Sequence, residues 1–161
     1  ASTLYNEITT MRFLQNYPNL LVSAYHAVEW VLLPFTRWLQ PGGLAERVFI
    51  PLEIITKGPV FDCRMCGQCI LHSTGMTCPM TCPKTLRNGP CGGVRTNGSC
   101  EIKPEMKCIW VEAWERSAQM KDYSEDILIV QGPVNHQRKG SSAWVNDLNA
   151  GVKTHPDGWL P

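Results

Sequence analysis

The chain has 161 residues, with 15 basic and 14 acidic side chains, and only 18% of its residues are charged. This length allows one domain of ordinary size or a small domain with extensions, and it excludes a (β/α)8 barrel, which needs about 250 residues. The near-neutral charge gives no electrostatic reason to expect nucleic acid as a partner. Few charges together with six tryptophans are typical of a protein whose surface is partly buried against another molecule.

Two helices are predicted in the N-terminal third of the chain. Residues 2–15 suit the first, because Ser2 is a favourable N-cap and apolar residues recur at helical spacing. Pro18 is tolerated in the first turn of a second helix, which covers residues 20–39. This second segment contains charged residues and a proline, which argue against a transmembrane span, yet it is apolar on more than one face. It is therefore either a fully buried core helix or a helix that docks on a partner subunit.

The next segment is predicted to be a turn followed by a short apolar stretch. The turn is Pro-Gly-Gly at 41–43, and the apolar stretch covers residues 48–55 and is interrupted by Pro51. Residues 1–62 are thus expected to form a helical N-terminal extension that docks on a partner.

All eight cysteines lie between Cys63 and Cys108, and the flanking sequence contains none. Disulfide frameworks usually spread their cysteines along the whole chain. The first residues lack the basic cap and apolar run of a secretory signal, so we expect a cytoplasmic protein with reduced thiols. Clustered reduced thiols indicate metal ligands, and residues 63–117 are predicted to be a cysteine-rich metal-binding domain.

The spacing of the cysteines is that of a cluster-binding protein. Cys63, Cys66 and Cys69 form C-x2-C-x2-C, the first three ligands of a bacterial ferredoxin run. Cys78 and Cys82 are each followed by proline, as is the fourth cysteine of such a run. All eight thiols are candidate ligands: Cys63, Cys66, Cys69, Cys78, Cys82, Cys91, Cys100 and Cys108.

Eight thiolates suit two [4Fe–4S] clusters, which is the favoured interpretation. The alternatives are one cluster plus one zinc ion, zinc alone (held by four cysteines, or by three cysteines and His72), and a structural disulfide scaffold. The three closely spaced cysteines at the start are expected to share one cluster, whose fourth ligand the sequence does not assign. In ferredoxin runs the cysteine before proline serves the other cluster, so Cys78 or Cys82 is a candidate for that role.

A last helix is predicted after the cysteines, opened by Pro104. It carries Met106, Trp110, Ala113 and Trp114 on one stripe. The two tryptophans either shield a cluster from water or pack in the core.

The remaining chain, residues 118–161, is expected to be an extended C-terminal tail that contains a short strand at 126–130. From residue 132 the sequence is polar and weakly periodic, and Trp159 favours a tail laid along another surface. The predicted fold class is α plus irregular structure: a small cysteine-rich cluster-binding domain with N-terminal helices, a helix after the last cysteine and this tail.

Few other residues suggest chemistry. Lys84, Arg87 and Arg95 are candidates to offset the charge of a cluster, although solvated surface positions are the favoured interpretation. The four histidines share no spacing, so no catalytic histidine is expected. The chain contains neither a phosphate-binding glycine motif nor a nucleophile elbow. On its own residues the chain is an electron carrier or a metal-stabilised binding module.

The cysteine region resembles a known family. Its motifs C-x-x-C-G-x-C, C-P-x-x-C-P-K, N-G-P-C-G-G and G-x-C-E, with a Trp-containing helix after the last cysteine, are similar to the C-terminal cysteine-rich domain of methylenetetrahydrofolate reductases. The matching positions are 63–69, 78–84, 88–93, 98–101 and 108–114.

The resemblance implies the small subunit of a two-subunit reductase, in which a (β/α)8-barrel subunit holds the flavin and folate sites. The small subunit of that family is taken to carry electrons to the flavin, and the complex interconverts 5,10-methylene- and 5-methyl-tetrahydrofolate. The leading hypothesis is therefore an iron–sulfur electron-transfer subunit docked on the flavin subunit. The alternative is a zinc-stabilised assembly subunit of the same reductase without a redox role.

Overall fold

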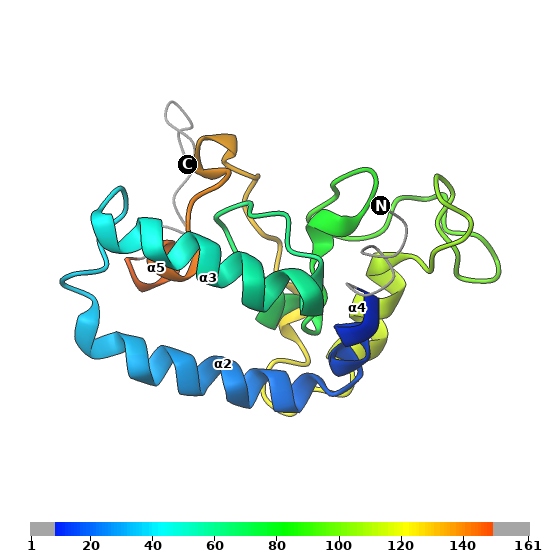
Figure 1. The fold of residues 1–161 in the computed structure, drawn as a ribbon. Coiled ribbons are helices and arrows are strands. Elements are labelled where there is room, and N and C mark those ends of the chain that lie inside the picture. Colours follow the sequence, from blue (N-terminus) through cyan, green and yellow to red (C-terminus); the bar gives the residue numbers. More distant parts are fainter. Residues whose placement is uncertain (1–8, 150–161) are drawn as a thin grey trace.

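The computed structural model describes residues 9–149, and their regular elements are all helical (Figure 1). The α-helices are α2 (Pro18–Leu32), α3 (Leu44–Phe61), α4 (Ile109–Ser117) and α5 (Ala143–Leu148). Short 3-10 helices are η1 (Thr9–Asn16), η2 (Leu33–Phe35), η3 (Leu71–Thr74), η4 (Pro79–Thr81), η5 (Asp126–Leu128) and η6 (His136–Arg138). Within residues 9–149 there is no strand, only an isolated bridge between Ser99 and Lys107. The predicted class of α plus irregular structure is confirmed.

The first two predicted helices are present in altered form. Residues 9–16 form a 3-10 helix, and the start of the predicted 2–15 helix lies outside the described residues. Helix α2 has Pro18 in its first turn, as predicted, but it covers Pro18–Leu32 instead of residues 20–39. Pro34 explains the early end, because it lacks an N–H and its ring clashes with the preceding helical turn; the chain tightens into η2 there.

Helix α3 corrects the predicted short apolar segment at 48–55. It runs for 18 residues and accommodates Pro51 in its interior. Its buried residues are Glu46, Glu53 and Lys57, which share one face at helical spacing, whereas Leu52 and Ile55 are exposed. A helix with a polar buried face and an apolar exposed face has the reverse of the usual pattern, so hydrophobic periodicity did not reveal its length.

The predicted bounds of the last helix and the predicted strand at 126–130 were both wrong. Helix α4 begins at Ile109 instead of Pro104, with the extended backbone of Cys108 at its N-cap position. The predicted strand at 126–130 is the 3-10 turn η5 followed by exposed residues, and no partner strand lies among residues 9–149.

The C-terminal region is not an extended tail as far as residue 149. It returns to the body of the protein and forms α5, which Ser142 caps by accepting a hydrogen bond from the Val145 amide at 3.2 Å. Val145 is fully buried among α2, α5 and the turn that follows η2. Trp159 lies outside the described residues, and the division into 1–62, 63–117 and 118–161 stays a prediction.

The apolar core consists of three small clusters. One, which includes Cys78, packs around Met76; one surrounds Trp144; and one joins Cys108 to Trp110 on α4. Two of the three clusters thus include a cysteine, so the core is built around the cysteine region. No helix among the described residues is both long enough and apolar enough to cross a membrane.

Candidate metal centre

The structure sorts the eight cysteines into two groups of four, each lining its own pocket. The first pocket is lined by Cys63, Cys66, Cys69 and Cys78. The second is lined by Cys82, Cys91, Cys100 and Cys108. All eight thiols are free. Among residues 9–149, no three His, Cys, Asp or Glu side chains lie close enough together to hold a single metal ion.

The loop that carries the first three cysteines reverses direction repeatedly as it leaves α3. Asp62 (φ 50°), Met65 (φ 47°) and Gly67 (φ 74°) all adopt left-handed backbone. Gly67 must be glycine for two reasons: its φ is positive, and a Cβ atom there would lie 2.6 Å from the Ser141 hydroxyl. The Met65 carbonyl also accepts a hydrogen bond from the Gly140 amide at 2.8 Å. Residues 138–141 therefore hold this loop in shape.

Cys78 and Cys82 belong to different pockets although only η4 separates them. The amide of Thr81 donates to the Cys78 carbonyl at 3.2 Å, and the Thr81 hydroxyl donates to the same oxygen at 2.7 Å. The Cys82 amide donates to the Pro79 carbonyl at 3.0 Å. This tight turn joins the two pockets covalently by three residues.

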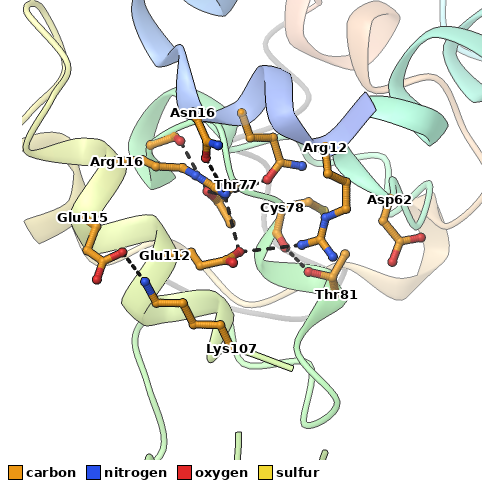
Figure 2. Close-up of polar contacts among 12 residues, drawn as sticks. Arg12, Asn16, Asp62, Thr77, Cys78, Thr81, Lys107, Glu112, Glu115 and Arg116 are labelled. Atoms are coloured by element: carbon orange, nitrogen blue, oxygen red, sulfur yellow. Dashed lines mark hydrogen bonds and ion pairs between the residues drawn. The ribbon is translucent and has the colours of Figure 1, made fainter. Parts of the chain in front are cut away.

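Helix α4 fixes the segment before Cys78. Figure 2 shows Arg116 between η1 and Thr77, and its Nη1 donates to the Thr77 hydroxyl at 2.9 Å and to the Gln15 amide oxygen at 2.6 Å. Glu112 forms ion pairs with Arg116 at 3.4 Å and with Arg12 at 3.6 Å. Through these contacts η1 and α4 together hold the residue that precedes Cys78.

The second pocket is formed mainly by local contacts within residues 82–110. The Cys100 amide donates to the Met106 carbonyl at 3.0 Å, and the Cys108 amide donates to the Gly98 carbonyl at 2.9 Å. Trp110 lines the pocket and its indole N–H donates to the Leu86 carbonyl at 3.2 Å. These loops project from the body of the protein beside α4 (Figure 1).

Two buried cations, Lys57 and Arg87, border the first pocket. The sequence did not point to Lys57, and it favoured a surface position for Arg87. Lys57 pairs with Glu53 (Nζ to Oε1 2.7 Å), and the two side chains are 9% and 2% exposed. Arg87 donates through both Nη atoms to the Gln68 carbonyl at 3.2 Å. Its Nε is buried without a hydrogen-bond partner. The favoured surface position for Arg87 was therefore wrong.

The first pocket shifts the pKa values of its thiols upward. Burial raises the pKa of Cys69 to about 11 and that of Cys78 to about 12, and it also raises the pKa of Cys63. Lys57 and a backbone hydrogen bond from Leu71 partly oppose the rise in pKa at Cys69. A backbone hydrogen bond from Met80 partly opposes the rise at Cys78. Without a bound cation these thiols are protonated at neutral pH, so metal binding would release protons.

The other residues singled out from the sequence lie as follows. Lys84 lines the second pocket and forms an ion pair with Glu101, whereas Arg95 is exposed. His72 lines neither pocket and packs edge-on against Tyr123 at 5.8 Å. Trp110 is buried, as either of its predicted roles requires, but Trp114 is 59% exposed.

The two buried carboxylates of α3, Glu46 and Glu53, were not predicted from the sequence, and they anchor α5. Glu53 accepts hydrogen bonds from the amides of Ala143 and Trp144, both at 2.9 Å, and Glu46 accepts one from the Ser142 amide at 2.9 Å. The only sequence signal was the polar stripe at positions 46, 53 and 57 of an otherwise apolar segment. Asn146 of α5 in turn donates to the Gly67 carbonyl at 2.8 Å, which connects this anchor to the cysteine loop.

Fold and site together define a small helical protein with two separate four-cysteine pockets. The family model described as "Methylene-tetrahydrofolate reductase C terminal" matches residues 44–137, more than half of the chain. The chain therefore belongs to this family, as the motifs predicted. The match covers α3, all eight cysteines and α4. No curated protein and no solved structure matches the chain significantly.

Proposed function

We propose that this chain is the electron-transfer subunit of a flavin-dependent methylenetetrahydrofolate reductase, with one [4Fe–4S] cluster in each pocket. The observation that carries the proposal is the sorting of eight cysteines into two groups of four. A [4Fe–4S] cluster takes four thiolates, so each pocket supplies one complete set. Cys78 is then the fourth ligand of the first cluster, and Cys82, Cys91, Cys100 and Cys108 hold the second.

The spacing of the first three cysteines favours a cluster over a zinc ion. Cys63, Cys66 and Cys69 form C-x2-C-x2-C, as in a bacterial ferredoxin run, whereas a single tetrahedral zinc ion has less use for three ligands so closely spaced. A [4Fe–4S] core of charge +2 with four thiolates carries a net charge of −2, as does a zinc ion with four thiolates, so the buried Nε of Arg87 beside the first pocket suits either centre.

The protein provides a short route between the two centres. When bound, each cluster accepts and releases one electron at a time. Only the three residues of the tight turn η4 separate Cys78 of the first pocket from Cys82 of the second. A second connection runs from Arg87 at the first pocket through the neighbouring Leu86 carbonyl to the Trp110 indole at the second.

The outer faces of α2 and α3 suit the flavin-binding barrel subunit as partner. They expose large apolar side chains that a free-standing carrier has no reason to display: Leu20, Trp30, Val31, Val48, Ile54 and Ile55. The family membership supplies the reaction, 5,10-methylene- to 5-methyl-tetrahydrofolate interconversion, whose flavin and folate sites lie on that cytoplasmic partner.

The experiment is metal and sulfide analysis, with a visible spectrum, of the anaerobically purified chain. Two clusters predict about eight irons and eight sulfides per chain. The reduced protein should then reduce the flavin of the barrel subunit. A colourless protein with zinc and no iron would refute the proposal. It would favour the second candidate, a zinc-stabilised assembly subunit, which the all-cysteine donor sets also suit.

A further inference from the structure

The backbone of the loop that carries Cys66 alternates between left-handed and ordinary conformations. Met65 (φ 47°) and Gly67 (φ 74°) are left-handed, whereas Cys66 and Gln68 are not. All four residues line the first pocket. This alternation is typical of a nest, a concave turn in which successive backbone N–H groups converge on an anion, and many iron–sulfur sites contain one. The first pocket is therefore lined by backbone that suits a negatively charged centre.

The carbonyl groups of this loop are held by residues that lie far from it in sequence. The Gly140 amide donates to the Met65 carbonyl, and Nδ2 of Asn146 donates to the Gly67 carbonyl, both at 2.8 Å. The described residues contain no cis peptide bond. In a trans peptide the carbonyl and the N–H of the next residue point in opposite directions. The N–H groups that follow these two carbonyls therefore point away from Gly140 and Asn146.

One of these N–H groups has nothing to bond within the described part of the chain. The Cys66 amide has no hydrogen-bond acceptor among residues 9–149, so it is available to a bound centre. The cysteine amides of the second pocket differ. The Cys100 amide donates to the Met106 carbonyl at 3.0 Å, and the Cys108 amide is bonded to the Gly98 carbonyl at 2.9 Å. An amide nest is thus a feature of the first pocket.

The side chain of Asn146 is fixed in one orientation, and the residue is only 1% exposed. Its Oδ1 accepts a hydrogen bond at 3.0 Å from Arg138, whose guanidinium can only donate. Nδ2 therefore faces the Gly67 carbonyl, and it also donates to the Ser141 hydroxyl at 2.7 Å. Helix α5, which carries Asn146, is anchored to the carboxylates of α3. Asn146 lies beyond residues 44–137, which the family model matches.

We propose, on the basis of the two-cluster function above, that Asn146 is a positioning residue for the first cluster. By holding the Gly67 carbonyl, it keeps the nest of residues 65–68 turned toward the cluster sulfurs. When this cluster takes up one electron, its net charge changes from −2 to −3 and no bond is made or broken. N–H groups that donate to the sulfurs stabilise the more negative form and so raise the midpoint potential. Asn146 does not line the pocket and acts through the backbone.

The test is a redox titration of the full chain, followed by electron paramagnetic resonance, in which Asn146→Leu is compared with Ser142→Ala. Leucine is similar in size to asparagine and uncharged, but it cannot hold the Gly67 carbonyl. Ser142→Ala removes the N-cap of α5 and leaves that hydrogen bond in place. Cys100→Ser, which removes a ligand of the second cluster, assigns the two midpoint potentials to their pockets.

Asn146→Leu should weaken reduction of the first cluster about tenfold, because a hydrogen bond to a charged group is lost. This is a fall of about 59 mV in the midpoint of a one-electron couple. The midpoint of the second cluster should not change. Ser142→Ala should leave both midpoints unchanged.

Ser141→Ala is a milder second variant, which decides the question if Asn146→Leu does not retain its first cluster. It removes one of the two acceptors that orient the Asn146 amide and should lower the same midpoint by less. An unchanged first midpoint in both variants, with about eight irons present, would overturn this inference and leave the two-cluster function intact. So would an equal fall in Ser142→Ala, which would assign the effect to the stability of α5. A wild-type chain without iron would instead refute the proposed function itself.

Discussion

The two cysteine pockets each contain four thiols but depend on the rest of the chain in different ways. The first is closed by distant segments: Gly67 packs on Ser141, and α5 is held by carboxylates of α3 some 90 residues earlier in the sequence. The second is closed by contacts within about 30 residues, such as the hydrogen bonds of Cys100 and Cys108. The shape of the first pocket therefore depends on the whole fold, and the shape of the second depends on local structure.

This contrast predicts unequal sensitivity to mutation, and the largest effect is expected at Glu53. Glu53→Ala leaves Lys57 buried without its anion and removes the acceptor of two α5 amides, so the free energy of unfolding should fall by about 3–5 kcal/mol. Chemical denaturation monitored by circular dichroism measures the loss.

Glu101→Ala is the matched change at the second pocket. Its carboxylate is one-third exposed and pairs only at the surface, so the expected loss is about 0–1 kcal/mol. Equal destabilisation by the two substitutions would show that the pockets do not differ in the way described.

A glycine in each loop gives an intermediate effect. Gly67 and Gly98 both have positive φ, but only at Gly67 would a Cβ atom meet the Ser141 hydroxyl at 2.6 Å; at Gly98 the space is open. Gly98→Ala should cost about 1 kcal/mol for backbone strain. Gly67→Ala should cost about 3 kcal/mol, because overpacking is added to the strain. The midpoints of thermal unfolding rank the two variants, and a larger loss at Gly98 would contradict the packing argument.

A small effect is also expected at the start of α5. Ser142→Ala removes the N-cap that accepts a hydrogen bond from the Val145 amide, and the expected loss is about 1 kcal/mol. Asn97→Ala, which removes a comparable bond to the Ser99 amide in an exposed loop of the second pocket, should cost less. The comparison fails if urea unfolding gives the Asn97 variant the lower stability.

The sequence predicted the family and a cysteine-rich centre but not the sorting of the eight cysteines into two pockets. Cys78 and Cys82 have the same local pattern, each followed by proline, so spacing alone did not place them in different pockets. The start of α2 at Pro18 was predictable because Pro suits a first helical turn. The length of α3 was not predictable, because its buried face is polar and because an interior proline such as Pro51 usually ends or kinks a helix.

Burial of charge was the other feature that local patterns did not reveal. Arg87 lies among turn residues and was expected at the surface. It is instead buried beside the first pocket and donates a hydrogen bond to the Gln68 carbonyl. Residues 126–130 have the apolar composition of a strand, but the described residues offer no partner strand, and the chain forms a 3-10 turn instead. Both outcomes depend on contacts between segments far apart in sequence.

The most direct test of the partition into two groups of four compares Cys78→Ser with Cys82→Ser in anaerobically purified protein. Iron content and the electron paramagnetic resonance spectrum of the reduced protein are measured for each variant. If Cys78 serves the first cluster and Cys82 the second, each variant keeps about four of about eight irons, and the two lose different signals. Loss of the same signal in both variants would place the two cysteines on one cluster and contradict the account.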